Sequence, residues 1–188
     1  CWCHRSGGSF THNLDGRMKS LNQYLVEFDN PQIYCDMDGV VADFLKFTRN
    51  ALGGNKFKDK FWQDIPVDTF AQLDKMPDAD VLWGYIKKFR PIMLTAAPRE
   101  SRGAIAKRAP QDKIRWMKKN FGLGERDMRV VKRQDKKKFA KDGRDKRPNI
   151  LIDDHAGNIK EWEAAGGIGI LHTDAASTIN DLKRIGFP

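Results

Sequence analysis

The stretch Ile33-Tyr34-Cys35-Asp36-Met37-Asp38-Gly39-Val40 decides the fold of this chain. Three apolar residues lead directly into an acidic pair, Asp36 and Asp38, and a glycine. A short run of nearly continuous apolarity is typical of a strand that is covered on both faces, as in a parallel sheet. The run therefore predicts a central strand with two carboxylates at its carboxyl end.

Apolar runs of the same kind recur further along the chain, at residues 92–94, 130–131, 150–152 and 168–171. Apolar residues at helical spacing separate them. The clearest predicted helix covers 110–121, where Pro110 suits the first turn and Gly122 can end the helix. Another is predicted at 156–165. This alternation predicts right-handed crossovers and a three-layer α/β sandwich around a central parallel sheet.

The segment from 45 to 86 breaks the alternation, because it is rich in aromatic residues and contains no convincing strand. We expect it to form a small helical cap inserted after the first strand. The predicted organisation is an N-terminal tail and helix at 1–31, an α/β core at 32–44 and 87–188, and the cap at 45–86. The N-terminal helix is predicted from the helical spacing of Met18, Leu21, Leu25 and Phe28.

The composition favours one globular domain whose partners carry negative charge. The chain has 188 residues, a formal net charge of +9 and a pI near 9.5. Its apolar stretches are far shorter than the roughly 20 residues of a membrane-spanning helix, and no signal segment is evident. The sequence has three cysteines. We therefore expect a soluble cytoplasmic protein rather than a secreted one that disulfide bonds hold together. No zinc-binding spacing is matched by Cys1, Cys3, His4 and His12.

Residues 99–147 are strongly basic. One interpretation is a solvated surface with a flexible loop, and the other is a contact surface for nucleic acid or polyphosphate. Charge patterning alone does not separate the two interpretations.

Acidic residues follow two of the predicted strands, with Asp36 and Asp38 after the first and Asp153 and Asp154 after the run at 150–152. The carboxyl ends of parallel strands lie at one edge of a sheet, which is where ligands bind in such folds. Carboxylates that converge there repel one another, and a hard cation relieves the repulsion. The pattern predicts a Mg²⁺ site, because Mg²⁺ prefers oxygen ligands and retains waters that a phosphate can replace.

Two other strand ends carry groups that suit a phosphate. Thr95 supplies a hydroxyl directly after 92–94, and Lys136 supplies an ammonium shortly after 130–131. Alone, each has a simpler explanation, since strand-ending Asp often caps a helix and Lys is usually solvated. Their combination favours a catalytic site for phosphoryl transfer.

Four motifs of the chain resemble those of the haloacid dehalogenase-like phosphatases. They are Asp36-Met37-Asp38-Gly39-Val40, Thr95 within Leu94-Thr95-Ala96, a lysine after Arg133-Gln134-Asp135, and Leu151-Ile152-Asp153-Asp154. The resemblance spans about 33–172 and implies a Rossmann-like sandwich. The extended first motif, which runs on to Asp43 and Phe44, most closely resembles the 5'(3')-deoxyribonucleotidases and related phage-encoded hydrolases.

The resemblance implies a role for each motif residue. Asp36 would be the nucleophile that forms an aspartyl-phosphate, and Asp38 would be the acid and base. Thr95 and a lysine would hold the transferring phosphoryl group. Residues Asp36, Asp38 through its backbone carbonyl, Asp153 and Asp154 would make up the Mg²⁺ site, with Asp153 in a supporting position.

The catalytic lysine is ambiguous, because Lys136, Lys137 and Lys138 are adjacent and a polar stretch at 141–148 separates them from the acidic pair. We prefer Lys136, which follows Arg133-Gln134-Asp135, with Lys138 as the second candidate. Asn158 is a further residue that could orient the acidic loop, but the pattern gives no firm assignment.

The substrate-binding residues predicted from the resemblance are Phe44, Phe61, Trp62 and Ala96. In the nucleotidases, aromatic side chains between cap and core stack on the base. The alternative is that Phe44, Phe61 and Trp62 form the core of the cap, because a small insertion must bury something to stay folded.

These features predict a Mg²⁺-dependent phosphomonoesterase that acts on nucleoside monophosphates, with deoxyribonucleotides favoured. One alternative is a polynucleotide 5'- or 3'-end phosphatase, which the basic charge of 99–147 would suit. The other is a non-catalytic nucleic-acid-binding protein with the same fold.

Overall fold

The computed structural model describes residues 31–141 and 146–188, and the structural statements below concern these residues. They belong to a unit that runs from Pro31 to Pro188. Several predictions from the sequence lie outside them: the helix at Met18–Phe28, the residues Cys1, Cys3, His4 and His12, and part of the polar stretch at 141–148.

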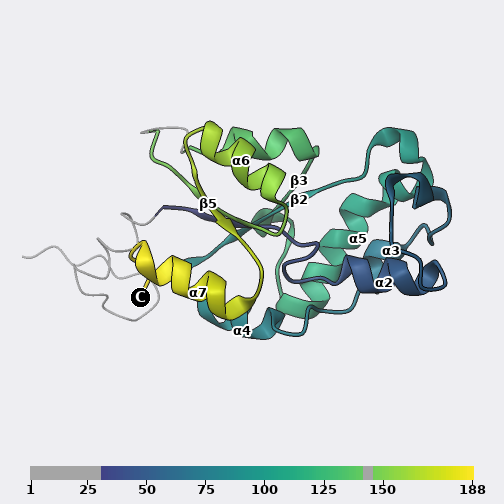
Figure 1. Ribbon diagram of the computed structural model, residues 1–188, viewed down its shortest axis with the longest axis horizontal. Helices are drawn as coiled ribbons and strands as arrows, with labels where there is room; N and C mark the ends of the chain where they lie inside the picture. Colours follow the sequence, from purple (N-terminus) through teal and green to yellow (C-terminus); the bar gives the residue numbers. More distant parts are fainter. Residues whose placement is uncertain (1–30, 142–145) are drawn as a thin grey trace, which may run out of the picture. The chain divides into compact units, whose positions relative to one another are not determined.

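Five parallel strands form the central sheet: β1 (Ile33–Cys35), β2 (Ile92–Ala96), β3 (Met128–Val131), β4 (Ile150–Asp153) and β5 (Ile168–Leu171). Their order is β3-β2-β1-β4-β5, so β1 lies in the middle (Figure 1). Within this sheet, Tyr34 is aligned with Ile92 on one side and with Leu151 on the other. All the predicted strands and the parallel sheet are confirmed.

Side chains of β1 alternate between two apolar cores, one on each face of the sheet. Ile33 and Cys35 enter the larger core, together with residues of α4 (Ala79–Ile86), α5 (Ala104–Phe121) and α7 (Ala175–Arg184). Tyr34 enters the smaller core and packs edge-on against Trp162 of α6 (Ala156–Ala164). In Figure 1, α6 lies on one side of the strands, and α4 and α7 lie on the other. The three-layer α/β sandwich is therefore confirmed.

Shorter elements connect these layers. They are α2 (Phe44–Ala51), α3 (Thr69–Gln72) and the 3₁₀ helices η1 (Asp59–Gln63), η2 (Lys87–Phe89), η3 (Glu100–Arg102), η4 (Glu125–Asp127) and η5 (Arg133–Phe139). Between β1 and β2, α2 packs against α3, α3 packs against α5, and α4 packs against α7. A separate cap at 45–86 stays a prediction, because α4 lies within that range and contributes Leu82 and Ile86 to the larger core.

The start of α5 differs from the prediction. The helix begins at Ala104, directly after Gly103, whose φ is 66°, and Pro110 lies inside it. The expectation that Pro110 opens the helix was wrong, because Ile105 and Ala109 are buried and the first turns therefore pack on the core. The proline costs the helix one N–H donor, which would otherwise reach the carbonyl of Ala106. The helix at Ala156–Ala164 agrees with its prediction to within one residue.

None of the helices in the described part of the chain is both long enough and apolar enough to cross a membrane.

His172 is a buried titratable group directly after β5, with a relative exposure of 5%. Its Nδ1 lies 2.8 Å from the hydroxyl of Thr178, and its Nε2 has no hydrogen-bond partner among the described residues. Burial lowers the pKa of His172 because it disfavours the charged imidazolium, although Asp78 and Asp174 act in the opposite direction.

We expect the contribution of His172 to the free energy of unfolding to decrease as the pH falls below about 6.5, because the unfolded chain then gains a proton on His172 that the folded chain binds less readily. The substitution His172→Gln should flatten this pH dependence, measured by chemical denaturation at several pH values between about 7 and 5. His155→Gln removes an exposed histidine and is the matched control, which should keep the wild-type slope. Identical slopes for all three proteins would contradict the prediction.

Candidate active site

The candidate site lies at the carboxyl edge of the sheet, where four neighbouring strands end. Asp36 follows β1, Thr95 lies in β2, Lys136 lies in η5 after β3, and Asp153 ends β4. Because all the strands are parallel, these ends share one edge. The topology thus brings together side chains that are more than 100 residues apart in the sequence.

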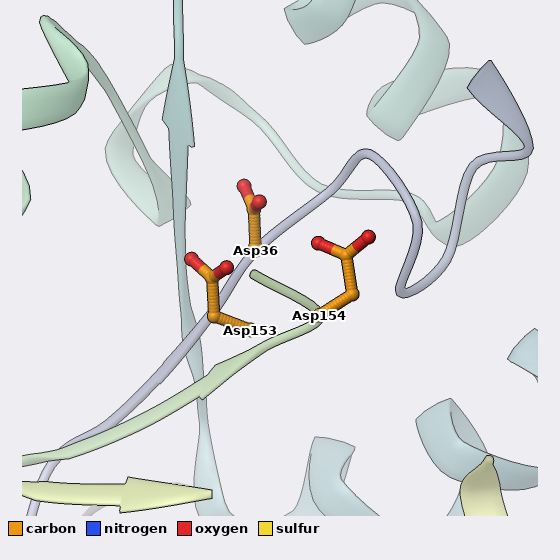
Figure 2. Close-up of side chains that lie close together, drawn as sticks. All are labelled: Asp36, Asp153 and Asp154. Atoms are coloured by element: carbon orange, nitrogen blue, oxygen red, sulfur yellow. The ribbon is translucent and has the colours of Figure 1, made fainter. Parts of the chain in front are cut away.

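Three carboxylates meet at this edge. Asp36, Asp153 and Asp154 each offer an oxygen, and these three atoms lie within 4.8 Å of one another. Figure 2 shows the three side chains rising from the ends of β1 and β4 toward the same region. Burial raises the pKa of Asp154 to about 7, and the charges of Asp36 and Asp153 add to this effect. Burial and the charge of Asp36 also raise the pKa of Asp153, and Lys136 opposes them.

Lys136 lies between two of these carboxylates. Its side chain is only 3% exposed, and its Nζ lies 2.9 Å from Asp36 Oδ1 and 2.7 Å from Asp153 Oδ2. Burial lowers the pKa of the Lys136 ammonium, but Asp36 and Asp153 together outweigh it, so the net pKa is raised. The ammonium is therefore held charged against the acidic cluster.

The geometry of η5 distinguishes Lys136 from its neighbours. Side chains three residues apart lie on the same face of a 3₁₀ helix. Arg133 contacts Asn158, Lys136 is buried and Phe139 packs into the smaller core, so this face points inward. Lys138 points elsewhere, because it is 70% exposed and its Nζ pairs with Asp135 at 2.8 Å. Of the two candidates from the sequence, only Lys136 lies beside Asp36.

Asp153 is surrounded by donors. Asn158 Nδ2 donates to both of its carboxylate oxygens, at 3.0 and 2.9 Å, and the backbone N–H of His155 donates to Oδ1 at 2.9 Å. Arg133 in turn donates to Asn158 Oδ1 at 2.9 Å. These contacts, with Lys136, make Asp153 better suited to holding its neighbours in place than to binding a ligand directly. The sequence offered only a weak hint of Asn158, and it singled out Arg133 only as part of the motif that precedes the lysine.

Asp38 belongs to a second group at the same edge. Its Oδ2 accepts a hydrogen bond from Lys113 of α5, and Lys113 also donates to the Thr95 hydroxyl at 2.8 Å. Burial raises the pKa of Asp38, and the neighbouring Lys113 opposes that shift. Among the described residues, Asp38 Oδ1 is buried and has no hydrogen-bond partner.

Lys113 is the functional candidate that sequence reasoning missed. We counted it within the basic residues of 99–147, but it is 0% exposed and belongs to no charged surface. Its spacing offered a signal, because it falls four residues after Ala109 and four before Met117, on the buried face of α5. A lysine at a core position of a helix is exceptional and needs a partner.

Gly39 lets the loop after β1 pass close to Asp154. Its φ is 79°, in the left-handed region that favours glycine. A Cβ at this position would overlap the Asp154 carboxylate, with Oδ2 as the nearest atom. The absence of a side chain at Gly39 therefore makes room for the acidic residue that the metal prediction requires.

The residues fit the predicted Mg²⁺. The donor set consists of oxygens alone, and Asp154 carries a raised pKa that a cation would lower. The carboxylate of Asp38 lies outside the three-residue cluster and turns to Lys113, so only its backbone carbonyl remains as the ligand the resemblance implies.

The predicted aromatic residues lie in the segment between β1 and β2. Ring contacts join Phe44 to Phe57, Trp62 and Phe70, with centroid distances of 5.1, 5.9 and 5.7 Å. Phe61 takes no part in the ring contacts found within the described ranges, although Lys60 lies over its ring. The cluster agrees with the alternative that Phe44 and Trp62 form an apolar core of this segment, and both rings remain only partly buried.

Comparisons with known proteins leave the function open. No family model matches the chain, and no curated protein matches it. Among solved structures, a hydrolase from Streptococcus pneumoniae TIGR4 matches with a TM-score of 0.44 and 11% identity, over 82% of this chain and 96% of its own. A Thermotoga maritima protein provisionally described as a beta-phosphoglucomutase matches with a TM-score of 0.40 and 12% identity, over 83% of this chain and 100% of its own. At these values we draw no conclusion on function from either likeness.

We expect Gly39→Ala to destabilise the folded chain by about 1–3 kcal/mol through backbone strain, with a further loss from the overlap with Asp154. We also expect MgCl₂ to raise the melting temperature of the wild-type protein, and the displacement of Asp154 to abolish this increase. Thermal unfolding with and without MgCl₂ measures both effects.

The matched control is Gly53→Ala, because Gly53 has a φ of 60° and no atom near the position of an added Cβ. This variant carries the strain without the overlap and should retain the stabilisation by MgCl₂. Equal responses of the two variants to MgCl₂ would argue against a cation site beside Gly39.

Proposed function

We propose that this chain is a Mg²⁺-dependent phosphomonoesterase of the haloacid dehalogenase-like type, which hydrolyses its substrate through an aspartyl-phosphate. One observation carries the proposal: Asp36 lies at the carboxyl edge of the sheet with Lys136, Asp153 and Asp154 around it. The simpler explanations are that the aspartates cap helices and that the lysine is solvated. Neither would bury a lysine between two carboxylates at the end of a parallel sheet.

In the first step, a carboxylate oxygen of Asp36 attacks phosphorus and the bond from phosphorus to the leaving oxygen breaks. The electron pair of that bond stays on the leaving oxygen, which takes a proton from the carboxyl group of Asp38. Lys136 and the Thr95 hydroxyl stabilise the charge on the phosphoryl oxygens. Thr95 suits this task because its oxygen accepts from Lys113 and its own proton remains available to donate.

In the second step, water attacks the phosphorus of the aspartyl-phosphate and gives its proton to the carboxylate of Asp38. The bond between phosphorus and the Asp36 oxygen breaks, which releases phosphate and restores both aspartates. Asp38 can serve first as acid and then as base, because the proton that its carboxyl group gives up in the first step is replaced by a proton from water in the second.

Asp36, Asp154 and the backbone carbonyl of Asp38 would hold Mg²⁺, with Asp153 as their support. When bound, the ion neutralises negative charge on the phosphoryl group and on the carboxylates. Lys136 contributes a fixed positive charge through its contact with Asp36 Oδ1.

For the substrate, we propose nucleoside monophosphates, with deoxyribonucleotides favoured. Phe44 and Trp62 support this choice because their rings are only partly buried and lie in the segment that follows β1. A base could stack on such a surface, with a free energy of about 1–3 kcal/mol. Phe61 and Ala96 stay in the proposed binding set as the residues beside Trp62 and Thr95 in the chain.

A polynucleotide end phosphatase is the second candidate. It is favoured by exposed basic residues on α5, which include Lys107, Lys118 and Lys119. Such a surface would bind an oligonucleotide in a strongly salt-dependent manner.

Asp36→Asn should abolish phosphate release and leave the melting temperature close to that of the wild type, because the amide keeps the shape but not the nucleophile. The measurement is phosphate release, with MgCl₂ and with chelator, from ribo- and deoxyribonucleoside monophosphates and from 5'- and 3'-phosphorylated oligonucleotides. The proposal expects activity that needs both Asp36 and MgCl₂, with mononucleotides preferred.

A preference for oligonucleotides that weakens with added salt would instead favour the end phosphatase. Substantial turnover by the Asp36→Asn protein would exclude Asp36 as the nucleophile. A wild-type protein that is inactive on every substrate but binds oligonucleotides would favour the non-catalytic alternative.

Lys136→Met and Lys138→Met form a matched pair within one short helix. Lys136→Met removes the positive charge between Asp36 and Asp153, so we expect kcat to fall by about 100-fold or more. Lys138→Met removes an exposed ion pair with Asp135, which contributes about 0–1 kcal/mol to stability, and should leave turnover nearly unchanged. Phosphate release per folded protein, with folding checked by circular dichroism, measures both; a larger loss in Lys138→Met would reverse the assignment.

A further inference from the structure

Lys113 is a fully buried lysine whose partners all belong to the candidate site or contact it. Its ammonium bonds to Asp38 Oδ2 and to Thr95 Oγ1, the latter at 2.8 Å. It also lies 4.4 Å from the centre of the Phe70 ring, which is itself buried. Two of its three N–H donors are thus used on residues to which the proposed function gives roles in chemistry.

The two oxygens of Asp38 have different surroundings. Oδ2 is held by Lys113, whereas Oδ1 is buried and has no hydrogen-bond partner in the part of the chain that the structure describes. A buried carboxylate oxygen without a partner is unfavourable unless another molecule supplies one. Substrate is the molecule that the proposed function brings to this edge of the sheet.

The position of the ammonium is well defined. Lys113 projects from the middle of α5, whose Ala109, Trp116 and Met117 are buried beside it. Phe70 of α3 closes the other side, and α3 packs against α5. A charge held between a core helix and an aromatic ring cannot follow Asp38 if that side chain rotates, so it restrains the carboxylate rather than adapting to it.

We propose that Lys113 is a positioning residue that holds Asp38 by Oδ2, so that Oδ1 is the atom that exchanges the proton with the leaving oxygen. This inference rests on the proposed function and deepens it. As the bond from phosphorus to the leaving oxygen breaks, the electron pair stays on that oxygen, and the proton on Oδ1 moves to it. The same ammonium of Lys113 also fixes the Thr95 hydroxyl, so the distance between the Asp38 carboxyl group and the hydroxyl that contacts the phosphoryl group stays constant.

A merely structural role makes a different prediction. A buried ion pair that only stabilises the fold would affect every substrate equally when it is removed. A residue that acts through the acid affects substrates according to how much their leaving oxygen needs a proton. The p-nitrophenolate leaving group needs little protonation, whereas an alkoxide leaving group needs it strongly.

The experiment compares kcat/KM for p-nitrophenyl phosphate and for an alkyl phosphate, because kcat/KM reports the step in which the leaving group departs. We expect Lys113→Met to lose at least about 10-fold more activity on the alkyl phosphate than on p-nitrophenyl phosphate. Lys113→Arg, which keeps the charge with a different shape, should show a smaller loss with the same selectivity. Lys160→Met removes an exposed charge from α6, away from the basic surface of α5, and should show neither loss.

Asp38→Asn tests whether Lys113 acts through Asp38. This variant should show the same selective loss on the alkyl phosphate, and adding Lys113→Met to it should cause no further selective loss. An additional selective loss in the double variant would overturn the inference.

The outcomes separate the inference from the proposed function. If the wild-type protein releases phosphate in an Asp36-dependent manner but the Lys113 variants lose equal activity on both substrates, the inference fails and the proposed function stands. If the wild-type protein shows no Asp36-dependent release, the proposed function fails and the inference fails with it. Should Lys113→Met not fold, the selectivity of Lys113→Arg decides the question, with a uniform loss counting against the inference.

Discussion

The structure depends on the balance of charge at one edge of the sheet. Asp36, Asp38, Asp153 and Asp154 meet there, and among the residues that the structure describes only Lys113 and Lys136 come to them as buried ammonium groups. Four carboxylates against two ammonium groups leave two negative charges when all are ionised, which is the amount that one divalent cation would cancel. Burial and the charges of Asp36 and Asp153 raise the pKa of Asp154, and a cation bound beside it would oppose this shift.

The fold and the acidic half of this charge balance could be predicted from the sequence, because both follow from local patterns. Each strand is a short apolar run, and the acidic residues come directly after two of them. Parallel strands must end at the same edge, so Asp36 and Asp153 could be brought together without any knowledge of tertiary contacts. The nine residues of α6 were equally visible, since Gly166 and Gly167 stop the helical pattern.

The other half of the charge balance consists of the two buried lysines, and their positions depend on packing that the amino-acid composition does not reveal. In the sequence, Lys113 is one of many cations in the basic stretch at 99–147. Its position on the buried face of α5 distinguishes it from the others. The predicted helix also began at Pro110, so Ile105 and Ala109, which are buried on that face, lay outside it. Lys136 was chosen over Lys138 by analogy, whereas the physical reason is the three-residue repeat of a 3₁₀ helix, which turns Arg133 and Lys136 inward together.

In the proposed function, the segment between β1 and β2 would connect substrate contact to proton transfer. Phe70 stacks on Phe44 at one end and contacts the ammonium of Lys113, which holds Asp38. A change in the packing of Phe44, such as a base inserted beside it, would therefore reach the Asp38 carboxylate through three contacts: Phe44 with Phe70, Phe70 with Lys113, and Lys113 with Asp38. In the proposed function, the aromatic cluster and the acid would be coupled parts of one site, because the same ammonium contacts the Phe70 ring and holds the Asp38 carboxylate.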